Sequence, residues 1–241
     1  MEEKSMDINK DEMSRPTPAP LPDGTSSGAK SITSPYEELR ESSAFRRLSI
    51  GIYGGTFNPL HNGHIALARS FLQQAGLDEV WFVVSPQNPF KINNDLLDDN
   101  IRLEMVRETL HGEPRIKVSD VEFHLPKPSY MYRTLRHLSA DYPGYKFTLL
   151  IGGDNWKAFD RWKNADEIIE NYEIAVYPRK GDNIDATALP SSVMLLDTPL
   201  IDISSTEIRQ RVRDGKSIDN LVPKETADFI EKNRLYRQPF R

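Results

Sequence analysis

Two histidines stand three residues apart, shortly after a pair of glycines. His61 and His64 follow Gly54-Gly55-Thr56, which comes directly after a short β-prone run at residues 50–53. Apolar residues then recur at helical spacing, so the segment is typical of a strand, a glycine turn and a helix. A large anion can approach bare backbone at such a turn and meet the N–H groups of the helix N-terminus. Each histidine alone suits a surface or helix-capping role. Together with the glycines they favour phosphate binding, because imidazole N–H groups stabilise charge that develops on a phosphate.

A second anion-binding pattern lies near the C-terminus, at residues 203–209, in the run Ile-Ser-Ser-Thr-Glu-Ile-Arg. Ser204 or Ser205 is a suitable N-cap for the helix predicted to follow, which leaves the first N–H groups of that helix for an anion. Arg209 lies on the first turns, where its guanidinium can clamp phosphate oxygens. An ordinary capped helix with a solvent-facing arginine is the alternative for this motif taken alone.

Four further residues have a possible role in the chemistry, and each also has a plain structural interpretation. Lys91 follows the second predicted strand, where a cation can stabilise a leaving pyrophosphate, although a solvated loop lysine is equally compatible. Asp154 stands just beyond a buried strand, where sheet enzymes place ligand-contacting groups, but aspartate is also a common turn residue after glycine. Trp162 suits either core packing or stacking on a cationic ring. For Arg102, on the helix predicted at 99–110, a helix-surface charge is favoured over a phosphate contact.

These stretches resemble the signatures of the nucleotidyltransferase superfamily, and most closely those of the bacterial nicotinate-nucleotide adenylyltransferases. Residues 54–64 carry the His-x-Gly-His motif and residues 203–209 carry the Ile-Ser-Ser-Thr-x-x-Arg motif, in the expected order. The resemblance covers about residues 48–236. The chain departs from the usual family pattern at four positions, which are Asn58 in place of Asp, Phe90 in place of His, Met131 in place of Thr, and Lys163 in place of Tyr.

The resemblance implies ATP-dependent adenylyl transfer to nicotinate mononucleotide, which gives nicotinate adenine dinucleotide and pyrophosphate in NAD biosynthesis. The implied catalytic residues are His61, His64, Lys91 and Arg209. The implied ATP-binding residues are Gly54, Gly55, Thr56, Phe57, His61, His64, Ser204, Ser205, Thr206 and Arg209. The mononucleotide would contact Lys91, Ser129, Tyr130, Met131, Asp154 and Trp162.

In that scheme Asp154 binds the ribose hydroxyls and Trp162 stacks on the pyridine ring. The backbone amides of residues 129–131 meet the nicotinate carboxylate. Mg²⁺ is expected to arrive with ATP and to be held mainly by the substrate, so no metal ligands are assigned to the protein.

Other functions remain open at this point. Within the superfamily, the alternatives are a nicotinamide mononucleotide, phosphopantetheine or other cytidylyl- or adenylyltransferase. A catalytically weak nucleotide-sensing protein is suggested by Asn58, Phe90 and the polar N-terminal stretch. Nucleic-acid binding is disfavoured by the net charge of −5. The sequence leaves acid-versus-amide selectivity and the oligomeric state, a homo-oligomer included, undecided.

The chain changes character near residue 47. Residues 1–46 are rich in proline, serine and mixed charges, which predicts a disordered extension, with a short helix within residues 36–45. A docking tail is less favoured there than a dispensable extension or an upstream start codon. Residues 47–241 alternate strand and helix patterns, with strands ending near residues 53, 85, 121, 151, 177 and 196. Helices are predicted after residue 62 and at 99–110, 129–138 (with Ser129 as N-cap), 165–171, 205–213 and 224–232. This predicts a doubly wound parallel α/β sheet, a Rossmann-like nucleotidyltransferase fold.

The composition excludes several kinds of site and cellular location for this domain. The 241 residues include no cysteine, which excludes disulfides and thiolate metal sites. No apolar run approaches the roughly 18 residues that a membrane span requires, and the N-terminus lacks a signal-peptide pattern. We therefore expect a soluble cytoplasmic enzyme that acts on small molecules, without a nucleic-acid or membrane partner.

Overall fold

The structure is a computed structural model that describes residues 46–86, 96–179, 184–198 and 202–237. Contacts divide the chain into two units, 1–45 and 46–241, and the described residues all belong to the second. The predictions for residues 1–45 and for Lys91 and Phe90 therefore lie outside the described residues.

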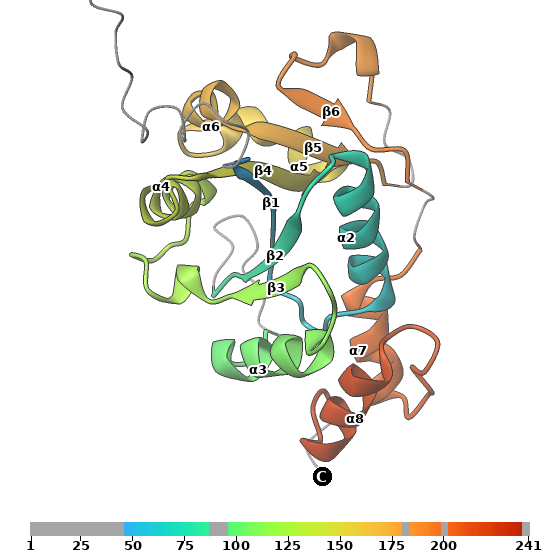
Figure 1. Cartoon of the computed structure of the whole chain (residues 1–241). Helices are drawn as coiled ribbons and strands as arrows, with labels where there is room; N and C mark the ends of the chain where they lie inside the picture. Colours follow the sequence, from blue (N-terminus) through green and yellow to red (C-terminus); the bar gives the residue numbers. More distant parts are fainter. Residues whose placement is uncertain (1–45, 87–95, 180–183, 199–201, 238–241) are drawn as a thin grey trace, which may run out of the picture. The chain divides into compact units, whose positions relative to one another are not determined.

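The described residues contain one six-stranded sheet in which every neighbouring pair is parallel. Its strand order is β3-β2-β1-β4-β5-β6 (Figure 1). The strands are β1 (Leu48–Gly55), β2 (Glu79–Val84), β3 (Ile116–Ser119), β4 (Tyr145–Gly152), β5 (Glu173–Tyr177) and β6 (Val193–Leu195). The order reverses between β1 and β4, and ligands bind outside the carboxyl ends of strands at such a point. The doubly wound α/β sheet predicted from the sequence is confirmed.

Helices cover both faces of this sheet (Figure 1). The helices are α2 (Asn62–Gln74), α3 (Asp99–Leu110), α4 (Met131–Asp141), α5 (Gly153–Trp156), α6 (Ala165–Asn171), α7 (Ser205–Arg213) and α8 (Lys224–Lys232). Short 3₁₀ helices are η1 (Val121–Phe123), η2 (Phe159–Arg161) and η3 (Ala186–Ala188). Apolar residues of α2 and α3 share one core with one face of the sheet, and those of α4 and α6 share another core with the opposite face.

The two cores follow from the alternation of side chains along the strands. On β1, Ile50 and Ile52 are fully buried on the α4 and α6 side, whereas Tyr53 is buried on the α2 side with Phe71 and Phe82. Both faces of a central parallel strand are therefore covered, which explains its near-continuous apolar run. A third core joins α3 to α7 and α8.

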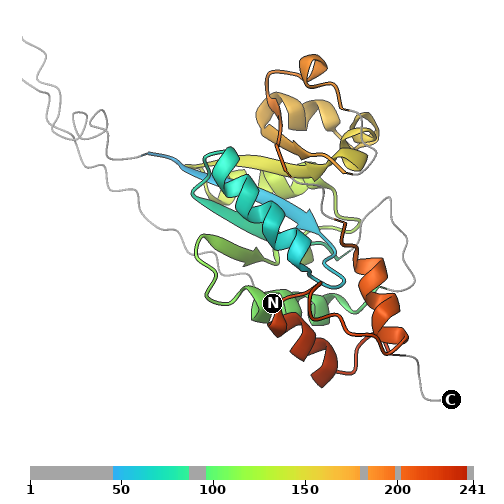
Figure 2. The same ribbon diagram turned by 90° about the vertical axis from the view of Figure 1, so that its right-hand side faces the viewer.

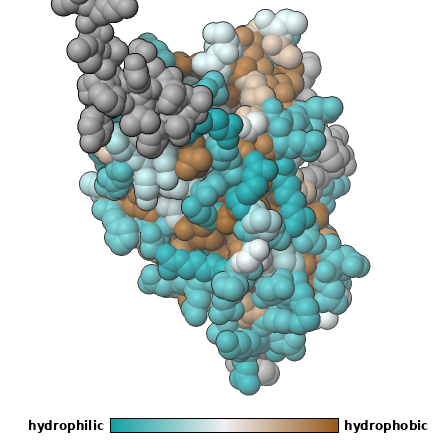
Figure 3. Space-filling view, in the orientation of Figure 1, coloured by the Kyte–Doolittle hydropathy of each residue, from teal (hydrophilic) through white to brown (hydrophobic). Residues whose placement is uncertain are grey.

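The C-terminal helices lie beside the N-terminal end of α2. The backbone N–H of Asn62 donates to the Leu221 carbonyl at 3.0 Å, and Figure 2 shows α7 beside this end of α2. Hydrophilic side chains dominate the face around α7 and α8 in Figure 3. The sheet, α2 and α7 thus converge on one region.

Two predicted elements differ in detail. The third strand is shorter than residues 115–121, because Arg115 has a φ of 65° and the chain turns into η1 at Val121. Helix α4 begins at Met131 with Tyr130 as its N-cap, so the prediction that Ser129 caps it is wrong. Ser129 is instead buried just before the N-cap, and its hydroxyl has no hydrogen-bond partner among the described residues.

Candidate active site

The turn after β1 is made by the residues that follow the glycines. β1 continues through Gly54 and Gly55, and the chain turns at residues 56–59, where Phe57 has a φ of 44°. The prediction that the strand ends abruptly at the glycines is therefore corrected. Their small size still has a use, since a Cβ on Gly54 would lie 2.7 Å from the Met131 Cε. Gly54 therefore brings bare backbone close to α4, and Gly55 leaves room for the Phe57 ring, which would lie 3.0 Å from a Cβ at that position.

Arg102 holds this turn from inside the protein. Its side chain is fully buried, and Nη1 donates to the carbonyls of Thr56 at 2.7 Å and Ser85 at 2.9 Å. Burial lowers the pKa of the guanidinium, and the ion pair with Asp99 opposes that shift. The expected helix-surface charge is wrong, because α3 aims this residue at the carboxyl ends of β1 and β2. Arg102 fixes the two strand ends relative to each other.

His61 and His64 form a stacked pair at the start of α2. His61 is the N-cap residue, and its backbone N–H donates to the Nδ1 atom of His64 at 3.2 Å. The ring centroids are 3.6 Å apart. Burial, reinforced by the Arg179 charge, lowers the pKa of His61 to about 4, and burial lowers the pKa of His64 well below its usual value. Both rings are therefore neutral at neutral pH. Because the Nδ1 of His64 accepts a hydrogen bond, its proton resides on Nε2.

The start of α7 is tied to the same turn. Ser204 is the N-cap and accepts a hydrogen bond from the Glu207 N–H at 3.2 Å. The Ser205 hydroxyl donates to the Pro59 carbonyl at 3.0 Å, and the Nη1 of Arg209 donates to the Asn58 carbonyl at 2.9 Å. Arg209 is buried, so the solvent-facing alternative is excluded for it. The N-termini of α2 and α7 consequently face one region.

That region is a cleft of about 540 Å³, which we call the α2 cleft. It is bordered by Tyr53, Gly54, Gly55, Thr56, Phe57, His61, Gly63, His64, Leu67, Asn155, Tyr177, Pro178, Arg179, Asp202, Ile203, Ser204, Ser205, Thr206 and Arg209. Within the described residues, the Nδ1 of His61 and the Nε of Arg209 are buried without a hydrogen-bond partner. Buried polar atoms normally have a partner, so these two indicate a ligand. The first N–H groups of α2 and α7 add donors and the positive ends of two helix dipoles.

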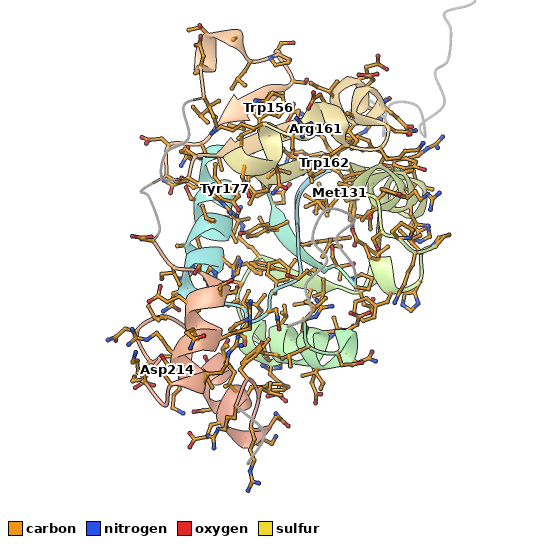
Figure 4. All side chains as sticks on the ribbon, turned by 180° about the vertical axis from the view of Figure 1, so that it is seen from behind. Met131, Trp156, Arg161, Trp162, Tyr177 and Asp214 are labelled. Carbon is orange, nitrogen blue, oxygen red and sulfur yellow. The ribbon has the colours of Figure 1, made fainter. Side chains whose placement is uncertain are left out.

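A second space of about 110 Å³, the α4 cavity, lies on the other side of the same glycines. It is bordered by Gly54, Gly55, Thr56, Ser85, Glu122, Ser129, Tyr130, Met131, Leu149, Leu150, Ile151, Gly152, Asn155, Trp162, Lys163 and Tyr177. In Figure 4, Met131 and Trp162 lie close together, with Tyr177 on the side toward α2. The Nε1 of Trp162 is buried without a partner in the described part of the chain. Residues 54–56, Asn155 and Tyr177 border both spaces, so the cleft and the cavity are neighbours.

Trp162 fits both of its sequence-based interpretations. Its ring centroid is 5.4 Å from that of Phe159, and it packs against the α4 and α6 core. The same side chain borders the α4 cavity beside Tyr130. It can therefore present one surface to a planar ring while the rest of the side chain is held by the core.

Asp154 lies at the rim, outside the residues that border either space. It is an exposed residue on α5, and its carboxylate forms an ion pair with Arg179, with 3.2 Å between Oδ2 and Nη1. Sequence reasoning missed Arg179, which borders the α2 cleft two residues beyond the end of β5. The rule that pointed to Asp154, that ligand-contacting groups follow strand ends, also applies to Arg179.

Glu122 was also missed, and it is buried at the side of the α4 cavity. Its carboxylate accepts hydrogen bonds from the hydroxyls of Ser85 at 2.7 Å and Thr134 at 2.9 Å. Burial raises the pKa of Glu122, and the hydrogen bonds from Ser85 and Thr134 partly offset this effect. Glu122 thus joins η1, the end of β2 and the first turn of α4. No sequence signal marked it, because an isolated glutamate in a polar loop has no periodicity.

The described residues contain no group of three or more His, Cys, Asp or Glu side chains placed to hold a metal ion. Among them there is likewise no helix long and apolar enough to cross a membrane.

Comparison with known proteins gives a consistent result. A family model described as cytidylyltransferase-like matches residues 52–211. A Bacteroides fragilis protein named "Probable nicotinate-nucleotide adenylyltransferase" is 49% identical over 168 residues, which cover 70% of this chain and 84% of that protein. A Flavobacterium johnsoniae protein of the same name is 42% identical over 193 residues, covering 79% of this chain and all of the relative.

The fold is also found among solved structures. The chain is similar to Plasmodium falciparum nicotinic acid mononucleotide adenylyltransferase complexed with NaAD, with a TM-score of 0.67 and 22% identity. This match covers 78% of the present chain and 97% of the Plasmodium chain. It supports the doubly wound α/β architecture described above.

Proposed function

The chain belongs to the nicotinate-nucleotide adenylyltransferase family of the cytidylyltransferase-like proteins, and on that basis we propose that it transfers the adenylyl group of ATP to nicotinate mononucleotide. An oxygen of the mononucleotide 5′-phosphate attacks the α-phosphorus of ATP. The bond between the α-phosphorus and the bridging β-oxygen breaks, pyrophosphate leaves, and nicotinate adenine dinucleotide forms for NAD biosynthesis. The attacking oxygen is already ionised at neutral pH, so catalysis requires positioning and charge stabilisation rather than a general base.

The observation that carries this proposal is the convergence of two helix N-termini and a neutral histidine pair on the α2 cleft. We place the triphosphate there. His64 donates its Nε2 proton to the α-phosphate as charge grows on it. His61, Arg209 and the N–H groups of α2 and α7 hold the β- and γ-phosphates. The unpartnered Nδ1 of His61 and Nε of Arg209 support this placement. Gly54, Gly55, Thr56 and Phe57, with the hydroxyls of residues 204–206, complete the ATP site.

The mononucleotide occupies the α4 cavity in this proposal. Trp162 stacks on the pyridine ring, which is cationic and therefore attracted to an aromatic face. The nicotinate carboxylate meets the backbone amides of residues 129–131 at the start of α4, where the helix dipole favours an anion. Asp154, at the rim, accepts hydrogen bonds from the ribose hydroxyls. The two phosphates to be joined then meet at residues 54–56, which border both spaces.

Mg²⁺ enters as part of the substrate, bound to the triphosphate. Among the described residues that border the α2 cleft, Asp202 supplies the only carboxylate, which fits an ion held chiefly by phosphate oxygens. The ion neutralises triphosphate charge when bound. The contact of Lys91 with the leaving pyrophosphate and a cytoplasmic location stay predictions from the sequence.

Pyrophosphate release with Mg·ATP tests this function. Nicotinate mononucleotide and nicotinamide mononucleotide are compared at equal concentrations, and we expect a strong preference for the acid. Preference for the amide would overturn the assignment of nicotinate mononucleotide as substrate but would leave the proposed adenylyl transfer intact. If neither compound gives pyrophosphate although ATP binds measurably, the proposed enzymatic activity is overturned and a nucleotide-sensing protein is favoured.

A further inference from the structure

Arg179 stands at the boundary between the two parts of the site, and the mechanism above gives it no task. It follows β5 after Pro178 and borders the α2 cleft. Its Nη2 donates to the Tyr177 hydroxyl at 3.0 Å, and the guanidinium lies 5.5 Å from the centroid of the Tyr177 ring. Tyr177 borders both the cleft and the α4 cavity. Tyr177 therefore holds the Arg179 guanidinium at the boundary.

Arg179 also forms an ion pair with Asp154, the residue proposed to bind ribose. Its Nη1 lies 3.2 Å from the Oδ2 of Asp154, and the side chains are 49% and 41% exposed. The absence of a side chain at Gly152 makes this pairing fit, since a Cβ there would lie 2.7 Å from the Asp154 Oδ1 and 3.1 Å from the Arg179 Nε. Pairs so exposed to water are weak. A stronger anion can therefore displace the carboxylate at little cost.

The α2 cleft is where such an anion is proposed to bind. Burial is the main cause of the lowered pKa values of His61 and His64, and the positive charge of Arg179 lowers both further, so Arg179 acts on the groups assigned to the phosphates. A guanidinium binds phosphate oxygens in a bidentate fashion, and that contact is stronger than one to an exposed carboxylate. Arg179 thus lies within reach of two competing anions.

Resting on the proposed function, we propose that Arg179 exchanges partners during substrate binding. The triphosphate entering the α2 cleft draws the guanidinium away from Asp154, and the released carboxylate accepts hydrogen bonds from the ribose hydroxyls of the mononucleotide. Each substrate then strengthens the binding of the other. Linkage requires that this effect be equal in both directions.

Calorimetry on the full chain tests the exchange. The dissociation constant of nicotinate mononucleotide is measured with and without Mg²⁺ and α,β-methylene-ATP, which cannot react at the α-phosphorus. We expect the analogue to tighten mononucleotide binding by about two- to fivefold, as suits the replacement of a partly exposed ion pair. The Arg179→Gln variant should lose this tightening. The matched control Arg69→Gln should keep it, because Arg69 forms a comparable exposed pair with Glu113 at 2.9 Å and borders neither space.

The variant Asp154→Asn should change the two binding affinities in opposite directions, which a purely structural role of Asp154 would not do. Asp154→Asn removes the competitor of the phosphates, so it should tighten binding of the analogue while weakening binding of the mononucleotide. It should also abolish the coupling. This variant keeps the test valid should Arg179→Gln fail to fold.

The outcomes separate this inference from the proposed function. Wild-type protein that releases pyrophosphate but shows no coupling overturns the exchange alone. Coupling that survives in Arg179→Gln also overturns it. Wild-type protein that neither binds the mononucleotide nor releases pyrophosphate overturns the exchange and the proposed function together.

Discussion

His64 has one proton to offer, and the local backbone decides where that proton points. Its Nδ1 accepts the His61 backbone N–H, so Nε2 carries the proton at the edge of the α2 cleft. Loss of one donor to a charge that develops in the transition state lowers kcat by about 10²- to 10³-fold. We expect His64→Asn to show a loss of this size in steady-state pyrophosphate release.

The KM of this variant separates chemistry from binding. An interaction made only in the transition state lowers kcat and leaves the KM for nicotinate mononucleotide almost unchanged. His111→Asn, at an exposed histidine after α3, is the matched control and should behave as wild type. Turnover close to wild type in His64→Asn would contradict the role assigned to His64.

Burial of the histidine pair also makes stability depend on pH. The pKa of His61 is about 4 in the folded protein, below its usual value of 6.5. The unfolded chain therefore binds a proton first as pH falls, and the stability that His61 contributes above pH 6.5 is lost between pH 6.5 and 4. The shift from 6.5 to about 4 corresponds to about 3 kcal/mol. Urea unfolding at several pH values should show a shallower acid slope in His61→Gln than in wild type, whereas His111→Gln should leave the slope intact.

At the scale of elements, Glu122 joins three segments around the α4 cavity. Its carboxylate accepts from Ser85 at the end of β2 and from Thr134 on α4, while Glu122 itself lies in η1. The pKa of Glu122 is raised chiefly by burial. The effect of Glu122 on the pH dependence of stability is therefore opposite to that of His61, because the folded protein holds the Glu122 proton more tightly than the unfolded chain does. Its stabilising effect is fully present below pH 4.5 and is lost as pH rises through the folded pKa.

Glu122→Gln should remove this pH dependence, since glutamine does not titrate. The variant is expected to gain stability relative to wild type as pH rises above 4.5, measured as the difference in unfolding free energy across pH. Glu122→Ala should instead lose about 1–3 kcal/mol at every pH, because it leaves buried hydroxyls without a partner. An unfolding free energy that differs from wild type by the same amount at all pH values in Glu122→Gln would contradict this account.

The elements that the sequence predicted well are those with strong periodicity or clear ends. The predicted bounds of α3, α6, β5, α7 and α8 agree with the structure. Asp98 caps α3 and Ser204 caps α7 through local hydrogen bonds, and a local interaction is visible in a linear sequence. Local rules about helix N-termini also marked His61, His64 and Arg209 as anion-binding residues, whereas their meeting in one cleft depends on tertiary contacts such as the hydrogen bond from Arg209 to the Asn58 carbonyl.

The residues that sequence reasoning misjudged depend on partners far along the chain. Arg102 donates to Thr56, 46 residues earlier, so the helical pattern alone gave no reason to bury it. Arg179 pairs with Asp154, 25 residues away, through adjacent strands of the sheet. Ser129 is buried one residue before the N-cap of α4 and does not cap that helix. Tertiary contacts of this kind leave no trace in spacing or composition.

At the scale of the whole described unit, the C-terminal segment closes onto the turn after β1. The Tyr236 hydroxyl donates to the Oδ1 of Asn58 at 2.9 Å, 178 residues away in the chain. Tyr236→Phe removes one hydrogen bond from a buried amide, which costs about 1 kcal/mol. Thermal unfolding should show a decrease in Tm of about 2–4 °C. An unchanged Tm would show that this contact does not stabilise the turn.

The contacts within residues 46–241 indicate which part of the chain is needed for activity. Residues 46–241 contain the three apolar cores, both parts of the site and the ion pair between Arg46 and Asp78. A chain that starts at Arg46 should therefore keep kcat and KM within about twofold of the full chain, since no assigned interaction of the site is removed.

A chain that starts at Ile52 is the matched control for this truncation. It lacks Leu48 to Gly51, which pair with β4 and in part with β2 at the centre of the sheet. Removal of half of a central strand exposes the apolar surface of both faces and leaves ladder hydrogen bonds unmade, so this chain should not fold. Circular dichroism and pyrophosphate release distinguish the two truncations. If the chain that starts at Arg46 folds but loses turnover, residues 1–45 take part in catalysis, because folding alone would then be insufficient for activity.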